Sequence, residues 1–188
     1  MEKAIKEIRL TEVRALENEE MVIEGYAVVF ESPATHYGYT EIVDRNAFSI
    51  CDMQDVCLKY NHDDSFLILA RTRNQSLQLT VDDKGLKIRA VLIDTTQNRD
   101  IYKMIQSGLL DKMSFAFTVK REEWDYDTDT RRILEIDKLY DVSVVDVPFY
   151  ESTEVYARSK ENYEEEKEKY NQKKLEFEKE KMKLLLSL

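Results

Sequence analysis

The feature that most constrains the fold of this chain is a series of short segments in which apolar and polar residues alternate. The segments are rich in β-branched and aromatic residues, and turn-forming residues separate them. Such segments are typical of strands that turn one face toward a core. Asp83-Lys84-Gly85 and the polar run 125–130 predict hairpin turns. We expect strands at residues 21–30, 56–60, 76–81, 86–92, 113–119, 132–136 and 139–147.

One helix is predicted within this β-rich region, at residues 95–107. Ile101, Met104 and Ile105 share a helical face, and Gly108 suits the position after the helix end. The polar residues 94–96 can cap the start of the helix. The sequence therefore predicts a mainly β fold with few helices (α+β), built as a mainly antiparallel sheet or barrel.

The composition changes abruptly near residues 158–160. The segment 160–188 contains no Gly or Pro and holds eight Lys and eight Glu. Strong helix formers dominate the segment and predict one helix about 42 Å long at about 1.5 Å per residue. We therefore expect a globular domain over residues 1–158, followed by a charged helical tail over residues 159–188.

The predicted tail helix carries a single apolar row. Its members recur every seven residues: Tyr163, Tyr170, Phe177 and Leu184. Charged residues occupy the positions of a coiled coil's second row: Glu166, Lys173 and Glu180. Two interpretations stay open. The helix either leans its apolar row on its own domain and is otherwise solvated, or it binds a partner or a second copy of the chain.

Charge and hydropathy exclude several classes of protein. The formal net charge is −10, and an acidic surface repels phosphate backbones, so we expect no nucleic-acid partner. No segment approaches the ~20 apolar residues of a membrane span, and residues 1–20 lack the apolar stretch of a signal peptide. Cys51 and Cys57 are not in CxxC spacing. We expect an intracellular chain with reduced thiols and no cofactor.

Two histidines, His36 and His62, are the side chains that can change charge near neutral pH. His36 lies in a predicted loop, where a surface role is expected. His62 ends a predicted strand, and period-two alternation places it on the face of Val56 and Leu58. It is a candidate general base or, together with Asp63-Asp64, a metal ligand. A hydrogen-bonded histidine at a strand end is the alternative.

Ser114 and Asp141 are unusual residues within predicted strands. Ser114 projects on the face opposite the aromatic residues of its strand, and Asp is depleted in strand interiors because a buried carboxylate needs a partner. A serine nucleophile needs an adjacent base, and a buried Asp can orient that base. His62, Ser114 and Asp141 therefore form a coherent catalytic set, although a filler serine is the alternative for Ser114 alone. Two other carboxylates adjoin a predicted turn or a strand end: Glu135 and Asp146.

Ordered blocks of this sequence resemble the prohead protease family of HK97-like tailed bacteriophages. The resemblance covers roughly residues 5–157, and the NHD and MSF cores together make it specific. The blocks are EGYA at 24–27, EIVDRNAF at 41–48, YNHD at 60–63, LART at 69–72, DKGL at 83–86, DT at 94–95, GLLDKMSFAF at 108–117 and YDVSVVDVP at 140–148.

The resemblance implies a fold like that of herpesvirus assembly proteases, a β-barrel flanked by helices. It implies that His62 and Ser114 are the catalytic histidine and serine; at the third position the family usually has Glu where this chain has Asp141. The implied task is cleavage of the scaffolding segment of the major capsid protein, or of a separate scaffold, inside the prohead in the host cytoplasm. Self-cleavage and a homodimer are implied as well.

The leading hypothesis is therefore a phage prohead serine endopeptidase that uses His62, Ser114 and Asp141. The alternative from another class is a catalytically inert capsid-assembly scaffold protein that acts through its helical tail. A serine-reactive probe distinguishes the two, because it labels only an activated serine.

Overall fold

The computed structural model describes residues 7–16, 20–36, 38–65, 68–146 and 154–186, with the backbone alone for 7–10, 16, 36 and 154–162. The elements in chain order are β1 (Glu7–Leu16), β2 (Val22–Val29), β3 (Ala34–His36), β4 (Tyr39–Val43), β5 (Cys57–Tyr60), β6 (Ala70–Arg71), the short 3-10 helix η1 (Thr72–Asn74), β7 (Leu77–Val81), β8 (Gly85–Val91), α1 (Thr96–Gln106), β9 (Lys112–Asp125), β10 (Thr130–Val145) and α2 (Glu154–Leu186). The prediction of a mainly β chain with few helices is confirmed.

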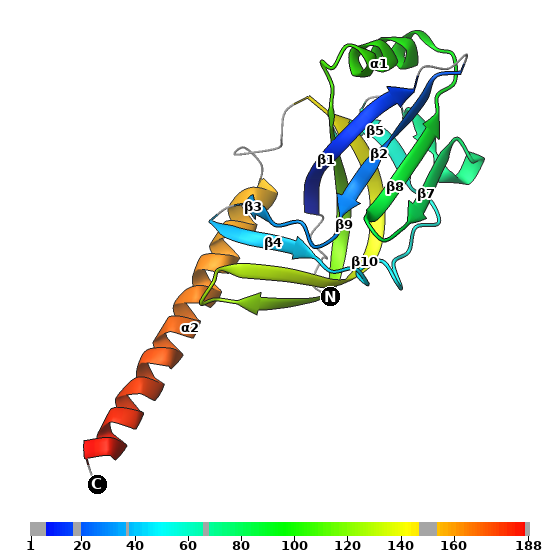
Figure 1. Cartoon of the computed structure of the whole chain (residues 1–188). Coiled ribbons are helices and arrows are strands. Elements are labelled where there is room, and N and C mark those ends of the chain that lie inside the picture. Colours follow the sequence, from blue (N-terminus) through cyan, green and yellow to red (C-terminus); the bar gives the residue numbers. More distant parts are fainter. Residues whose placement is uncertain (1–6, 17–19, 37, 66–67, 147–153, 187–188) are drawn as a thin grey trace.

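The strands form a 10-stranded sheet whose main path runs β3-β4-β10-β9-β1-β2-β8-β7, with β5 paired to β10 and β6. Neighbouring strands are antiparallel, except that β10 pairs in parallel with β4 near its start and with β5 near its end. The sheet folds over, so that β2 and β8 pass in front of β5 and β10 (Figure 1). A single apolar cluster joins these strands and includes Ile23, Leu58, Ile88 and Val142.

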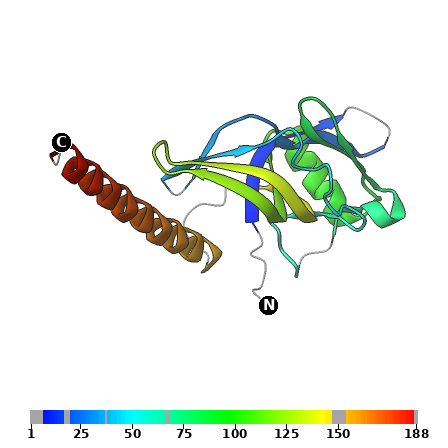
Figure 2. The same cartoon turned by 90° about the horizontal axis from the view of Figure 1, so that it is seen from below.

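The longest strands, β9 and β10, form a ribbon whose turn end projects from the other strands together with β3 and β4 (Figures 1 and 2). The separate strands expected at residues 132–136 and 139–147 are one continuous strand. The polar Asp137-Lys138 pair predicted a turn, but register shifts between Ile133 and Asp141 accommodate it within β10. A β-bulge adds a residue without ending the pairing, so an alternation pattern can break where the strand does not.

Near its start β9 is buried on both faces. Met113, Phe115 and Phe117 belong to the apolar cluster. Ser114 and Thr118, on the opposite face, are also almost fully buried, with 0% and 2% of their surface exposed. Ser114 is therefore not a filler serine on a half-exposed strand, and its hydroxyl lies out of contact with solvent.

The strands that the sequence missed are β1, β3, β4 and β6. The β1 sequence EIRLTEVRAL mixes charged and helix-favouring residues, and pairing with β9 and β2 on its two sides overrides that preference. Helix α1 lies where it was predicted: Thr95 Oγ1 accepts a hydrogen bond from Asn98 N at 3.2 Å, and Gly108 has a φ of +73° after the helix end.

Helix α2 starts at Glu154, so the expected boundary near residue 158 lies inside a helix. The helix passes the tip of the β9–β10 ribbon and continues away from the sheet (Figures 1 and 2). Neither helix in the described ranges is long and apolar enough to span a membrane.

Candidate active site

A tight turn after β5 sets the position of His62. Asn61 and His62 both have positive φ, at 51° and 55°, a region that Asn and His tolerate better than most residues. Hydrogen bonds to β10 hold this turn: Asn61 N donates to Val144 O at 2.9 Å, and His62 N donates to Ser143 Oγ at 3.2 Å. The left-handed turn carries His62 to the face of β10 that bears Asp141. The expected core face, shared with Leu58, is therefore wrong, because strand alternation ends at Tyr60.

The His62 ring is bound through its Nδ1 atom. Nδ1 forms a short hydrogen bond with Asp141 Oδ1, and Ser143 Oγ lies 3.2 Å from Nδ1 and 3.1 Å from the same carboxylate oxygen. The side chains of His62 and Asp141 are 7% and 1% exposed. A neutral imidazole beside a carboxylate carries its proton on Nδ1, which leaves Nε2 as an acceptor.

Ser114 lies on β9 directly across from Ser143 of β10. Directly opposed residues in an antiparallel pair have Cβ atoms about 5 Å apart. Within the part of the chain that the structure describes, neither Ser114 Oγ nor His62 Nε2 has a hydrogen-bond partner, and both atoms are buried. The structure thus joins His62 to Asp141 and places Ser114 one strand away, without a hydrogen bond between Ser114 and His62.

Lys59 is a charged neighbour that the sequence analysis did not identify. Its Nζ lies 3.7 Å from Asp141 Oδ2 and also binds the Asp64 carboxylate, and the lysine side chain is only 13% exposed. Burial works to lower the pKa of Lys59, but the hydrogen bond to Asp64 and the charge of Asp141 raise it. The period-two pattern of β5 hid this residue, because it places Lys59 on the face opposite to the one expected for His62, whereas the pairing of Lys59 with Ser143 brings it to the site.

The other candidate side chains are engaged elsewhere. Glu135 Oε1 accepts a hydrogen bond from Arg121 Nε at 3.0 Å, and Asp146 Oδ2 accepts one from Tyr60 OH at 2.9 Å. His36 ends β3, and its side chain lies outside the described residues. No cluster of three or more His, Cys, Asp or Glu side chains that could hold a metal ion occurs within the described ranges.

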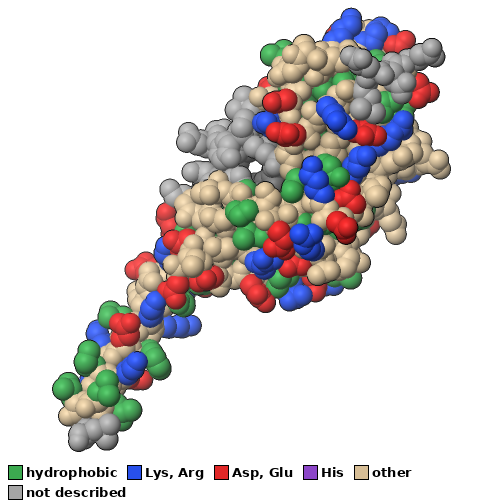
Figure 3. Space-filling model, in the orientation of Figure 1, with side chains coloured by type: hydrophobic (Ala, Val, Ile, Leu, Met, Phe, Trp, Pro, Cys, Tyr) green, Lys and Arg blue, Asp and Glu red, His purple; other side chains and the backbone are tan. Residues whose placement is uncertain are grey.

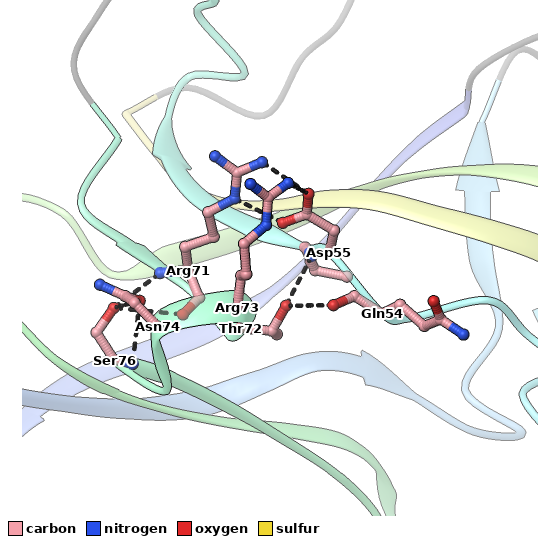
Figure 4. A network of polar contacts seen from close by, with 8 residues as sticks. Gln54, Asp55, Arg71, Thr72, Arg73, Asn74 and Ser76 are labelled. Atoms are coloured by element: carbon pink, nitrogen blue, oxygen red, sulfur yellow. Dashed lines mark hydrogen bonds and ion pairs between the residues drawn. The ribbon is translucent and has the colours of Figure 1, made fainter.

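An arginine–aspartate network fastens the segment after β5 to the start of that strand (Figure 4). Arg71 donates to both carboxylate oxygens of Asp55, at 2.6 and 2.7 Å, and Arg73 binds the same carboxylate. Arg71 and Arg73 together hold the pKa of Asp55 well below its usual range. Ala70 of β6 pairs with Leu58 of β5 and has an ordinary strand conformation.

Comparison with known proteins gives one match. No curated protein and no solved structure matches the chain. A family profile described as "Caudovirus prohead serine protease" matches residues 9–168, which include every site residue above and the first part of α2. The chain therefore belongs to the prohead serine protease family of the caudoviruses.

Proposed function

We propose that this chain is a serine endopeptidase in which Ser114 is the nucleophile, His62 the general base and Asp141 the residue that orients the base. The observation that carries the proposal is the His62–Asp141 hydrogen bond, which leaves Nε2 free on a ring next to the strand of Ser114. Buried polar atoms without partners are uncommon and destabilising. A buried hydroxyl and a buried ring nitrogen without other partners can bind each other once substrate brings the site together, as a nucleophile and its base must.

The proposed reaction follows from the protonation pattern of the ring. His62 Nε2 takes the Ser114 proton as Oγ attacks the scissile carbonyl, and the Asp141 carboxylate stabilises the imidazolium that forms. The imidazolium then gives its proton to the leaving amine. Water hydrolyses the acyl-enzyme by the reverse sequence of proton transfers. Ser143 positions the base, since its hydroxyl contacts the backbone of His62, the ring and Asp141.

The arrangement is closed to a peptide. Ser114 and Asp141 have no exposed surface, and the His62 side chain has very little. Attack on a peptide therefore requires that the groups above Ser114 move aside and that its hydroxyl swings to Nε2. Catalytic hydrogen bonds are often long or absent before substrate binds.

The family supplies the biological setting of this proposal. The peptidase works inside the prohead, in the host cytoplasm, and cleaves the scaffolding segment of the major capsid protein or a separate scaffold. It also cleaves itself and acts as a homodimer. We propose in addition that the folded-over sheet with its flanking helices is the barrel of the herpesvirus assembly proteases.

Co-expression of the chain with its neighbouring capsid and scaffold proteins, followed by mass spectrometry of new termini, tests the proposal. Ser114→Ala should abolish the new termini and the labelling by a fluorophosphonate probe, without loss of folding. Thr118→Val is the matched control, because Thr118 Oγ1 is another buried hydroxyl without a partner, on the same strand face. New termini at wild-type levels in Ser114→Ala would contradict the nucleophile assignment. No new termini from the unaltered chain would favour the inert scaffold instead.

A further inference from the structure

The face of the sheet that carries Asp141 continues across β5 onto β6. Leu58 of β5 and its partner Ala70 of β6 belong to the apolar core. Their neighbours Cys57 and Arg71, which also pair with each other, therefore lie on the opposite face. Cys57 pairs in turn with Asp141 of β10. Arg71 thus shares the face of Asp141 and lies two strands away from it.

Arg71 and Arg73 lie side by side, and both guanidinium groups bind the carboxylate of Asp55 (Figure 4). Arg71 uses Nε and Nη2 for its two hydrogen bonds, whereas Arg73 uses Nη2 alone. Two positive charges against one negative charge leave the cluster with a positive charge in excess. Within the described residues, Asp55 is the single partner of the Arg73 side chain, which is 68% exposed. The Nε and Nη1 donors of Arg73 are therefore available to a ligand.

Other basic residues on this face have their charge offset. Lys59 and Lys112 share the face with Ser114, and each of them lies close to two carboxylates. In the arginine pair, by contrast, the positive charges outnumber the carboxylate. An arginine also presents its N–H donors as a planar fork that matches a carboxylate, which a lysine does not. An acidic side chain is therefore the ligand that suits the pair.

We propose that Arg71 and Arg73 form a subsite that binds the carboxylate of an acidic residue, Asp or Glu, in the peptide that Ser114 cleaves. This inference rests on the proposed function and names a specificity determinant for it. Arg73 supplies the free donors, and Arg71 positions them through the shared carboxylate of Asp55.

The spacing of the strands sets the distance between the acidic residue and the scissile bond. Arg71 on β6 and Ser114 on β9 are three strand spacings apart, about 14 Å, and their rows are offset by two residues, about 7 Å. Their Cα atoms are thus about 16 Å apart if the sheet is taken as flat. An extended peptide advances about 3.3 Å per residue, and the side chains bridge part of the gap, so the acidic residue should lie about three to five residues from the scissile bond.

Peptides that span a new terminus found by the co-expression experiment test the subsite. Glu or Gln is placed at one position, about three to five residues from the cleaved bond on either side, and kcat/KM is measured for each Glu–Gln pair. At one of these positions the unaltered chain should cleave the Glu peptide about fivefold faster, as a partly exposed ion pair would allow, and added salt should reduce the preference. Arg73→Gln should remove the preference by lowering kcat/KM for the Glu peptide. Arg73→Glu should make the Glu peptide the poorer substrate of the pair.

Arg89→Gln is the matched control, because Arg89 also shares a carboxylate with a second basic residue. Arg89 Nε and Lys87 Nζ lie 3.5 and 3.3 Å from the carboxylate of Glu24. These residues alternate with core residues of β2 and β8 and so lie on the outer face of those strands, where Figure 3 shows basic and acidic side chains interspersed. The Glu preference should persist in Arg89→Gln.

The results separate this subsite from the peptidase activity itself. If the unaltered chain cleaves both peptides of every pair equally, or if Arg73→Gln keeps the Glu preference, the subsite is overturned and the peptidase assignment stands. If no peptide is cleaved in a Ser114-dependent way, the proposed function fails and the subsite fails with it.

Discussion

Polar side chains at the two ends of the β9–β10 ribbon differ in burial and in hydrogen bonding. At the end that carries Ser114 and Ser143, polar side chains are fully buried, and Ser114 Oγ has no hydrogen-bond partner in the described structure. At the other end, Asp127 and Asp129 are partly exposed and bind lysines and tyrosines of α2. A buried polar group without a hydrogen bond lowers the stability of the fold, whereas an exposed ion pair changes that stability little. The difference fits the proposed catalytic site at one end and the attachment of α2 at the other.

The largest effect should come from Asp141→Asn at the buried end. Asn keeps the size but removes the charge that stabilises the imidazolium, and it can turn an NH₂ group toward Nδ1 and so favour the wrong tautomer. The corresponding change in chymotrypsin-type proteases lowers kcat by about 10⁴. We expect a loss in peptide cleavage between about 10² and 10⁴, because general-base catalysis contributes that range. The measurement is kcat at matched folding, checked by circular dichroism.

Two variants accompany this measurement. Asp141→Glu should be milder than Asp141→Asn, because it keeps the charge and restores the residue usual in the family. Glu135→Gln should leave cleavage intact, since Glu135 binds Arg121. If Glu135→Gln were crippling and Asp141→Asn active, the third member of the catalytic set would be misassigned.

The opposite result, lost stability with intact chemistry, is expected from Glu41→Leu. Glu41 of β4 is 2% exposed and accepts a hydrogen bond at 3.0 Å from Nη1 of Arg131, near the start of β10. Loss of Glu41 leaves the buried guanidinium with Glu122 as its carboxylate partner, so the cost should lie below the about 3–5 kcal/mol of a fully broken buried pair. Urea unfolding measures the change. The double variant Glu41→Leu/Arg131→Met should recover much of the loss, and the idea fails if it is no more stable than Glu41→Leu alone.

A smaller effect, on pH dependence, should follow from Lys59→Met. Lys59 sits between Asp141 and Asp64 and offsets part of the Asp141 charge. Without it, the Asp141 carboxylate acts on the site with its full charge, so the acid limb of kcat/KM should move to higher pH. Lys87→Met, which removes a lysine paired with Glu24 on another part of the sheet, should leave the profile in place. A move of the acid limb to lower pH in Lys59→Met would contradict this account of the Asp141 charge.

The sequence predicted what depends on local pattern, and it missed what depends on pairing. The β2, β5, β7 and β8 segments lie within one or two residues of their expected ranges. The helix-like composition of β1 hid a strand, because its conformation is fixed by two neighbouring strands. His62 was singled out as a residue, but its face was wrong, because the left-handed turn at Asn61 depends on hydrogen bonds to β10. The roles of Lys59 and Ser143 likewise required the register between β5 and β10.

The smallest effect should appear where α2 meets the ribbon tip, as pH falls. The hydrogen bond from Lys167 to Asp129, and that from Lys174 to Asp127, lower the pKa of each aspartate, with Tyr163 and Tyr170 adding to the effect. A carboxyl whose pKa is lower in the attached state favours attachment fully above its ordinary value of about 3.9 and loses that contribution as pH falls through the lowered value.

Trp124, the single tryptophan of the chain, stacks on Tyr163 and so reports attachment of α2 through its fluorescence. Its emission should stay constant from neutral pH down to about pH 4 and change only below that, and added salt should weaken attachment because these ion pairs are partly exposed. Asp129→Asn should reduce the pH dependence by removing the group that titrates. A change in emission already at pH 6, with unaltered far-ultraviolet circular dichroism, would mean that groups other than these aspartates hold α2 in place. The ion pairs of Asp127 and Asp129 would then not explain how α2 is attached to this end of the ribbon.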